Sequence, residues 1–215
     1  MWSNLEQNIL LVRCFSSNTK SANFPPHINV YIYSEQADVS HAYQLLRRNG
    51  IPVENIVTIM YDDVANCPDN PFPGKLFNDY EHHDVYHDVV VDYRGEDVTP
   101  ENFIGVLLGD AKLKSTGKKV LESGPDDDVF IFFTDHGAPN MICFPNKDVI
   151  LAVTAANSHE SSMGCFCDDK LIDTCLADEY SYRWITDSEK AVEYGTGSRK
   201  MHFIDDSVHP VGHLA

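Results

Sequence analysis

The chain has 215 residues with 16 Lys and Arg against 33 Asp and Glu, which gives a formal net charge of −17 at pH 7. A surface this negative repels phosphate backbones and anionic lipids, so we expect binding neither to nucleic acids nor to membrane surfaces. Hydrophobic residues make up 43% of the chain and charged residues 23%, a composition typical of a packed core and not of a disordered acidic chain.

The first 28 residues are polar and contain several Ser, Asn and Pro residues, and we expect them to form a disordered lead-in. Their one apolar stretch, residues 8–12, is short and has no basic residue before it. A secretory signal requires a basic start and a longer apolar segment, so the sequence predicts no signal peptide. No apolar run approaches the ~18–20 residues that span a bilayer.

The first regular elements are predicted between residues 28 and 60. Residues 28–33 are β-prone and predict a strand. Residues 37–49 have apolar side chains at helical spacing, two arginines in the last turn and Gly50 as the stop, and therefore predict an amphipathic helix. Residues 56–60 predict a second strand. The order strand, helix, strand is a βαβ unit, which implies a parallel sheet.

A second helix is predicted after a long loop. Residues 61–96 are rich in Asp, Asn, Pro and Gly and predict this loop. Thr99 and Pro100 then have the residue types of an N-cap and a first helical position, and the apolar stripe that follows reaches Ala111.

Residues 129–133 are five consecutive apolar β-formers between acidic residues and a Thr-Asp-His-Gly sequence. Such a run is typical of a central strand of a parallel sheet that is buried on both faces. Residues 149–156 predict a further strand, and residues 175–184 a short helix or turn.

Asp135 and His136 directly follow the predicted central strand. Ligands of open α/β sheets bind beyond the carboxyl ends of such strands, so His136 stands where chemistry is expected. An imidazole beside a carboxylate and before a glycine suits a general base. The alternative is a loop histidine without function.

Two other clusters could suggest a metal site. His83 and His87 in the segment 81–88 have the i, i+4 spacing of zinc ligands on a helix, but the flanking residues indicate a solvated loop. Cys165 and Cys167 have no second cysteine pair, so we interpret them as structural or as part of a loop disulfide. No glycine-rich phosphate loop is present. We expect neither a metal nor another cofactor.

A series of short motifs between residues 35 and 188 resembles the legumain family of asparaginyl endopeptidases, which are cysteine peptidases. The motifs lie at residues 36–44, 48–52, 60–63, 70–74, 84–86, 92–95, 98–103, 133–137, 154–157, 160–162 and 174–178. The related transamidase subunit that attaches lipid anchors shares fewer of them. The resemblance implies a caspase-like α/β fold of three layers with a mostly parallel central sheet. It places the peptidase domain at residues 29–188 and leaves 189–215 as an irregular tail.

The resemblance also implies roles for five residues. His136 matches the catalytic histidine, and Asp135 matches its acidic neighbour. Three residues match positions that line the pocket for the asparagine side chain of the substrate, namely Ser161, Ser162 and Asp178. The carboxylate of Asp178 could accept a hydrogen bond from the amide nitrogen of the substrate. The implied partners are peptides or proteins with Asn at the cleavage position, and the family is lysosomal or vacuolar.

The chain departs from the family where the nucleophile should stand. Relatives carry a Glu-Ala-Cys-Glu-Ser-Gly segment between the Thr-Asp-His-Gly and Thr-Ala-Ala-Asn motifs, whereas here residues 144–148 lead almost directly into 149–153. A strand–helix unit with the nucleophilic cysteine is therefore missing, and none of the six cysteines has its context. Ser34 and Ile32 replace a pocket arginine and a supporting asparagine. From the same comparison we expect a helix after Ser188 and the C-terminal prodomain of the family to be missing as well.

These departures decide what we expect of the activity. A general base without a thiolate cannot form an acyl-enzyme, so we expect no meaningful asparaginyl endopeptidase activity from the chain as written. One alternative is a non-catalytic pseudo-peptidase that binds peptides or a full-length relative, and another is an incomplete gene model or splice form. Losing an interior strand also leaves unpaired sheet edges, which predicts low stability or aggregation.

Overall fold

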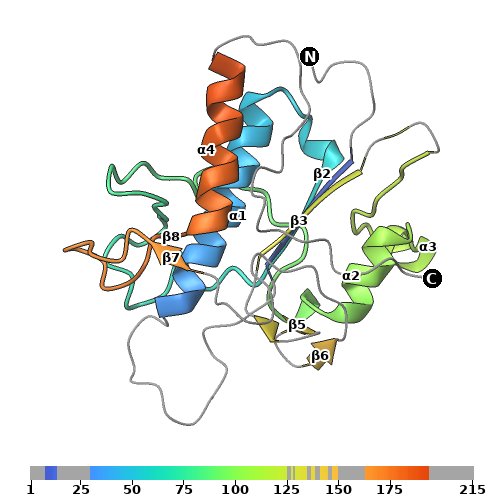
Figure 1. Ribbon diagram of the computed structural model, residues 1–215. Helices are drawn as coiled ribbons and strands as arrows, with labels where there is room; N and C mark the ends of the chain where they lie inside the picture. Colours follow the sequence, from blue (N-terminus) through green and yellow to red (C-terminus); the bar gives the residue numbers. More distant parts are fainter. Residues whose placement is uncertain are drawn as a thin grey trace.

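A three-stranded parallel sheet organises the chain (Figure 1). The computed structural model describes residues 8–13, 30–124, 127, 129–134, 137–138, 141–144, 147–149 and 163–193. The strands are β1 (Asn8–Arg13), β2 (Ile56–Met60) and β3 (Val129–Phe133), in the order β2-β1-β3. Leu11 of β1 pairs with Thr58 of β2 and with Phe132 of β3. The described chain is thus a mixed α/β protein.

Helices cover both faces of this sheet (Figure 1). The helices α1 (Val30–Arg48) and α4 (Glu179–Glu193) lie side by side on one face, and α2 (Pro100–Leu107) and α3 (Ala111–Ser115) lie on the other. Each face has a hydrophobic cluster of its own, centred on Leu11, Leu46 and Ile185 beneath α1 and α4. The cluster beneath α2 contains Val57 and Val106.

The remaining elements are short. Three strands form an antiparallel sheet, β4 (Gly137–Ala138), β5 (Met141–Phe144) and β6 (Lys147–Val149). Two more form a separate antiparallel pair, β7 (Gly164–Cys165) and β8 (Ala177–Asp178). Single 3₁₀ turns occur at Val53–Asn55 and Gly95–Asp97. No helix within the described ranges is long and apolar enough to cross a membrane.

The first predicted strand is wrong. Residues 30–33 open the long helix α1, and the first strand of the sheet is β1, which lies inside the predicted lead-in of residues 1–28. Tyr33 and every residue from there to Tyr43 are buried, so this part of α1 packs on all sides. The βαβ unit itself is confirmed, with β1 as its first strand.

The predicted helix after Thr99 is confirmed at its start and is shorter than expected. Thr99 Oγ1 accepts a hydrogen bond from the backbone N–H of Asn102 at 3.1 Å, as an N-cap does. The helix α2 ends at Leu107, because Gly109 adopts a φ of +63° that breaks the helical path. Asp110 then caps α3 by accepting from the N–H groups of its first turn.

The strand predicted at residues 129–133 is confirmed as β3, but its predicted burial on both faces is wrong. It pairs with β1 on one side, and in the described part of the chain no strand pairs with its other side. Val129 and Ile131 are 43% and 46% exposed, so the strand is not buried on both faces. The strand expected at 149–156 lies outside the described residues except for Val149, which ends β6. The short helix or turn expected at 175–184 is confirmed only in part, because residues 177–178 form β8 and the helix α4 begins at Glu179 and runs on to Glu193.

Candidate functional site

Of the five site residues implied by the resemblance, the structure describes one. The backbone is described to Thr134, which is buried directly after β3. The next two residues, Asp135 and His136, lie outside the described residues, as do Ser161 and Ser162. Asp178 is described as the last residue of β8. The surroundings of Asp178 are therefore the part of the candidate site that can be built from contacts.

Asp178 lies against a second carboxylate, that of Asp38 in α1. The backbone N–H of Asp178 donates to Asp38 Oδ2 at 3.2 Å, and the side chain of Asp38 is fully buried. Burial, and next to it the charge of Asp178, raise the pKa of Asp38 well above its usual range. The pair therefore favours a protonated carboxyl at Asp38 under conditions in which a surface aspartate is ionised.

Asn78 connects this pair to a histidine. Its Nδ2 donates to Asp38 Oδ1 at 2.8 Å and to the carbonyl oxygen of Leu176 at 3.2 Å. The amide oxygen of Asn78 therefore faces Nδ1 of His41, 2.8 Å away. Because an amide oxygen only accepts, Nδ1 of His41 must carry a proton.

The chain of contacts ends on α4. Nε2 of His41 lies 3.2 Å from Glu189 Oε1, and the guanidinium of Arg48 donates to the same oxygen. The hydrogen bond from His41, and after it the charges of His41 and Arg48, lower the pKa of Glu189. Asp178, Asp38, Asn78, His41 and Glu189 thus form one polar network that joins β8, α1, the loop after β2 and α4.

The sequence did not point to Asp38, Asn78 or His41 as site residues. A signal was present in the first half of α1, where six of eight residues from 34 to 41 are polar, although this segment lies next to the apolar residues that pack the helix on the sheet. Buried polar side chains need hydrogen-bond partners, so a buried helix of this composition implies a polar network around it.

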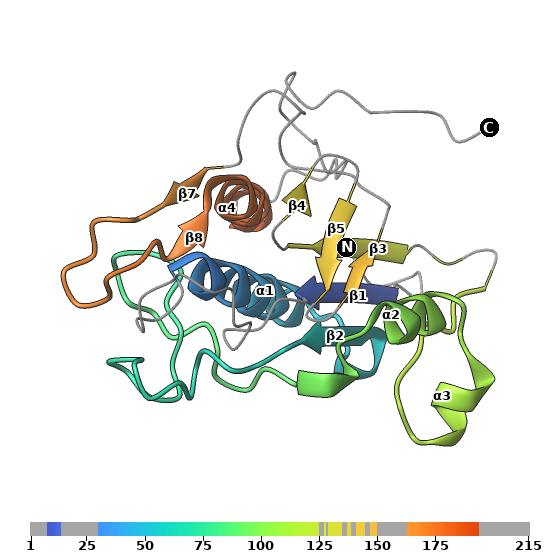
Figure 2. The ribbon, with the colours of Figure 1, turned by 90° about the horizontal axis from the view of Figure 1, so that it is seen from below.

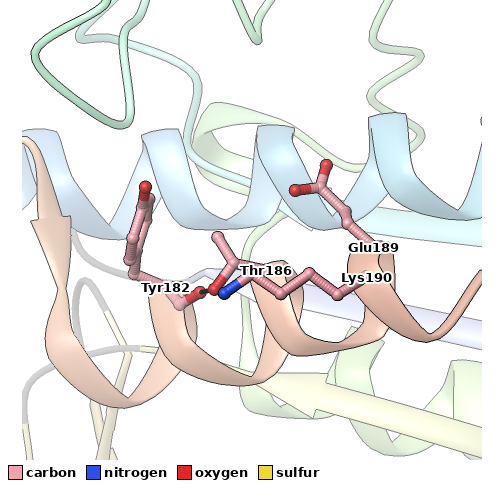
Figure 3. A pocket seen from close by; sticks show the side chains of 4 residues that line it. All are labelled: Tyr182, Thr186, Glu189 and Lys190. Atoms are coloured by element: carbon pink, nitrogen blue, oxygen red, sulfur yellow. Dashed lines mark hydrogen bonds between the residues drawn. The ribbon is translucent and has the colours of Figure 1, made fainter. Parts of the chain in front are cut away.

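A groove opens beside the network. It has a volume of about 340 Å³ and lies between α1, the loop of residues 78–87 and α4. Next to it a hollow of about 310 Å³ is lined by Tyr182, Thr186, Glu189 and Lys190 (Figure 3). Tyr182 and Glu189 point towards α1, and Thr186 Oγ1 donates to the carbonyl oxygen of Tyr182 at 2.8 Å. Most residues that line the two hollows are charged or polar, and neither hollow includes the end of β3.

The three cysteines near Asp178 are a disulfide pair and one free thiol. Cys167 and Cys175 form a disulfide in the loop between β7 and β8, which confirms the loop-disulfide alternative for Cys167. Cys165 is a half-buried free thiol. Burial, and then the nearby charges of Asp38 and Asp178, raise its pKa to about 12. This thiol therefore stays protonated and is a poor nucleophile.

The histidines of residues 81–88 do not converge on one point. Each faces a different carboxylate, with Nε2 of His82 2.6 Å from Asp169 Oδ2. The other two pairs are His83 with Glu81 and His87 with Asp88. Across the residues whose side chains are described, no group of three His, Cys, Asp or Glu could hold a metal ion.

Comparison with known proteins identifies similar chains. A hemoglobinase of Schistosoma mansoni is 44% identical over 238 positions, which cover 85% of this chain and 55% of the relative. Human legumain is 43% identical over 203 positions, covering 74% and 47%. The vacuolar-processing enzyme delta-isozyme of Arabidopsis thaliana is 37% identical over 210 positions, covering 74% and 45%. The chain spans about half the length of the curated relatives it matches.

These alignments are longer than the stretch of this chain that they cover. The aligned 85% of 215 residues is about 183 residues, so the 238 positions shared with the Schistosoma hemoglobinase include about 55 at which this chain has no residue. With human legumain, 74% is about 159 residues, and about 44 of 203 positions have none. The Peptidase C13 family model matches in two parts, residues 27–150 and 145–210, which meet where the missing unit was expected. These matches cover most of the chain, which therefore belongs to the Peptidase C13 family.

Proposed function

We propose that this chain is a legumain-type member of the C13 family with a caspase-like fold and without peptidase activity. The observation that carries the proposal is the break of the family match at residues 145–150, together with about 55 relative positions that have no residue here. The break lies between His136 and the Thr-Ala-Ala-Asn motif at 154–157, where relatives carry the nucleophile. His136 then has no thiolate to activate, and no acyl-enzyme can form.

The cysteines near the pocket support this proposal because none of them can replace the nucleophile. Cys167 and Cys175 are joined in a disulfide. Cys165 is held as a neutral thiol by burial and by the carboxylates around it, with a pKa of about 12. A cysteine nucleophile instead needs a thiolate, which positive neighbours or a helix N-terminus favour.

The pocket implied by the resemblance keeps Asp178 and loses its arginine. Ser34, which stands in the position of the arginine, is buried in α1. We infer that the pocket can still accept a hydrogen bond from the amide nitrogen of an asparagine side chain, without the cation of the active relatives. A second candidate function is therefore weak binding of Asn-containing peptides or proteins without cleavage. Because one relative is named a vacuolar-processing enzyme, we propose an acidic lysosomal or vacuolar compartment for the family's role.

The test is hydrolysis of a fluorogenic peptide with Asn at the cleavage position, from about pH 4 to pH 7, by purified protein whose folding is verified by circular dichroism. Human legumain serves as the positive control and iodoacetamide-treated protein as the negative control. We expect no Asn-dependent hydrolysis. Hydrolysis that iodoacetamide abolishes would show that a remaining cysteine acts as nucleophile, and the proposal would be wrong.

Peptide binding is measured separately by fluorescence anisotropy. We expect an uncleavable Asn peptide to bind more tightly than the same peptide with Ala, and the difference to be lost in Asp178→Ala. Equal binding of both peptides by the unaltered protein would exclude the second candidate function.

A further inference from the structure

The backbone around Asp178 is fixed on both sides of its side chain. The strand β8 lies beside the start of α1 and leads directly into α4 (Figure 2). The backbone N–H of Asp178 donates to Asp38 Oδ2 at 3.2 Å. The N–H of the next residue, Glu179, donates to the carbonyl oxygen of Met163 at 2.8 Å. These two hydrogen bonds fix the point from which the carboxyl group of Asp178 extends.

Asn78 fixes the chain just before Asp178. Its Nδ2 donates to Asp38 Oδ1 at 2.8 Å and to the carbonyl oxygen of Leu176 at 3.2 Å. Both oxygens of Asp38 are thus bonded to groups that hold β8, one through Asn78 and the other directly. Asp38 is therefore the side chain through which α1 holds the segment that carries Asp178.

The side chains of Asp38 and Asp178 are also joined to each other by a hydrogen bond. Two carboxyl groups can form such a bond only when one of them carries a proton. The proton belongs on Asp38, because Asp38 is fully buried whereas Asp178 is half-buried, and an ionised carboxylate costs more free energy at the less exposed position. The pair therefore has a single negative charge, and Asp178 carries it.

The other titratable groups near this pair come from β7, α1 and α4. Cys165 of β7 feels the charge of both carboxyl groups, and also that of Glu179 and Arg183 at the start of α4. On α1, the imidazole of His41 contacts the amide oxygen of Asn78, which separates it from the pair. Since the thiol of Cys165 stays protonated, the surroundings of the pair favour one charge and one shared proton.

We propose that Asp38 is a positioning residue of the asparagine pocket, in which it keeps the shared proton and holds Asp178 in place as the ionised acceptor for the substrate amide. This inference rests on the proposed binding of Asn-containing peptides. A hydrogen bond to an ionised carboxylate is about twice as strong as one between neutral groups. If Asp38 loses its proton, two negative charges lie side by side and repel each other, so the carboxylate of Asp178 no longer keeps its place.

Fluorescence anisotropy of the full chain with uncharged, uncleavable Asn and Ala peptides, from about pH 5 to pH 9, tests the proposal. The unaltered protein should prefer the Asn peptide by about ten-fold at pH 5. This preference should fall as the pH rises through the pKa of Asp38, which burial and the charge of Asp178 raise. In Asp38→Asn, the amide donates to Asp178 at every pH, so the preference should change by less than about two-fold.

The matched control is Ser40→Ala. It removes a buried hydroxyl from the same part of α1, one that donates to the carbonyl oxygen of Gln36 at 2.7 Å, and it should keep the pH profile of the unaltered protein. Equal binding of both peptides by the unaltered protein would exclude the binding function and this inference with it. A preference that Asp178→Ala abolishes, but whose pH profile is flat in the unaltered protein or unchanged in Asp38→Asn, would overturn the role of Asp38 alone. A preference lost in Asp38→Asn at every pH would also overturn that role.

Carbon-13 NMR of protein labelled at the aspartate carboxyl carbons tests the shared proton without a peptide. The signal of a protonated carboxyl group should persist at about pH 6 in the unaltered protein, well above the ordinary titration of aspartate. It should be missing in Asp38→Asn, and in Asp178→Asn it should titrate at lower pH because the neighbouring charge is gone. An unaltered, folded protein without such a signal would overturn the proposal.

Discussion

The polar network around Asn78 yields a sharp stability prediction. The side chain of Asn78 is 2% exposed and contacts the imidazole of His41, the carboxyl of Asp38 and the carbonyl of Leu176. Asn78→Ala removes all three contacts and leaves the three partner groups buried. The substitution therefore tests whether the network stabilises the fold or is only compatible with it.

The expected loss of stability in Asn78→Ala follows from the number of buried groups that lose a hydrogen-bond partner. A buried polar group without its hydrogen bond costs about 1–3 kcal/mol. Two of the three groups keep another hydrogen-bond partner, because Asp38 still accepts from the N–H of Asp178 and His41 still contacts Glu189. We therefore expect the free energy of unfolding to fall by about 3–6 kcal/mol, a large part of the ~5–15 kcal/mol of an ordinary domain.

Urea unfolding followed by circular dichroism measures this loss by linear extrapolation. In a chain of this size each kcal/mol lowers Tm by about 2–4 °C, so a loss of about 4 kcal/mol lowers it by about 8–16 °C. The matched control is Asn102→Ala, where one contact is lost, from Nδ2 to the carbonyl oxygen of Asp97 at 2.8 Å, and about 1 kcal/mol is expected. If Asn78→Ala costs no more than the control, the network carries no stability and the reasoning is refuted.

Three further predictions concern the same region. The pKa of Asp38 is raised in the folded state, so its contribution to stability is fully present below the ordinary pKa of aspartate and is lost as the pH rises through the folded-state pKa. Urea unfolding from pH 4 to 8 should therefore show the unaltered protein losing stability relative to Asp38→Asn, and parallel curves for the two proteins would contradict this. Iodoacetamide should label Cys165 at pH 8 at least about 100-fold more slowly in the folded protein than in urea, because its thiol has a pKa of about 12, and equal rates in mass spectrometry would exclude a buried neutral thiol. Gly164→Ala should lower the free energy of unfolding by about 1–3 kcal/mol, because the added methyl group would lie 2.9 Å from Cys175 Sγ. This loss of stability should shrink once the disulfide is reduced and the sulfur can move, and an equal loss in dithiothreitol would show that the contact with Cys175 is not its cause.

Local signals predicted the elements whose ends are set by neighbouring residues. Thr99 and Pro100 marked the start of α2, and the apolar run of β2 marked its strand, because caps and apolar runs act within a few residues. The burial of a strand was not predictable in this way. The run of β3 predicts a strand buried on both faces, yet Val129 and Ile131 are 43% and 46% exposed, because burial depends on what packs against each face and not on the run itself.

The network around Asp178 was beyond the reach of local patterns. His41 contacts Asn78 37 residues away and Glu189 148 residues away, and no periodicity links positions this far apart. Asp178 itself was found through the resemblance to a family motif and not through chemistry. Its partner Asp38 lies in another matched motif, but only the fold shows that the two carboxylates meet.

The middle strand of the sheet is also the first to be synthesised. Leu11 of β1 has its two partners, Thr58 and Phe132, far along the chain, so β1 leaves the ribosome long before the sheet can close around it. Until then its apolar residues have no strand to pair with, and contacts of such long range form slowly. The same topology makes β1 a vulnerable point in the finished protein, because a cut or a bulky attachment that draws it out separates β2 from β3 and removes Leu11 from the core beneath α1 and α4.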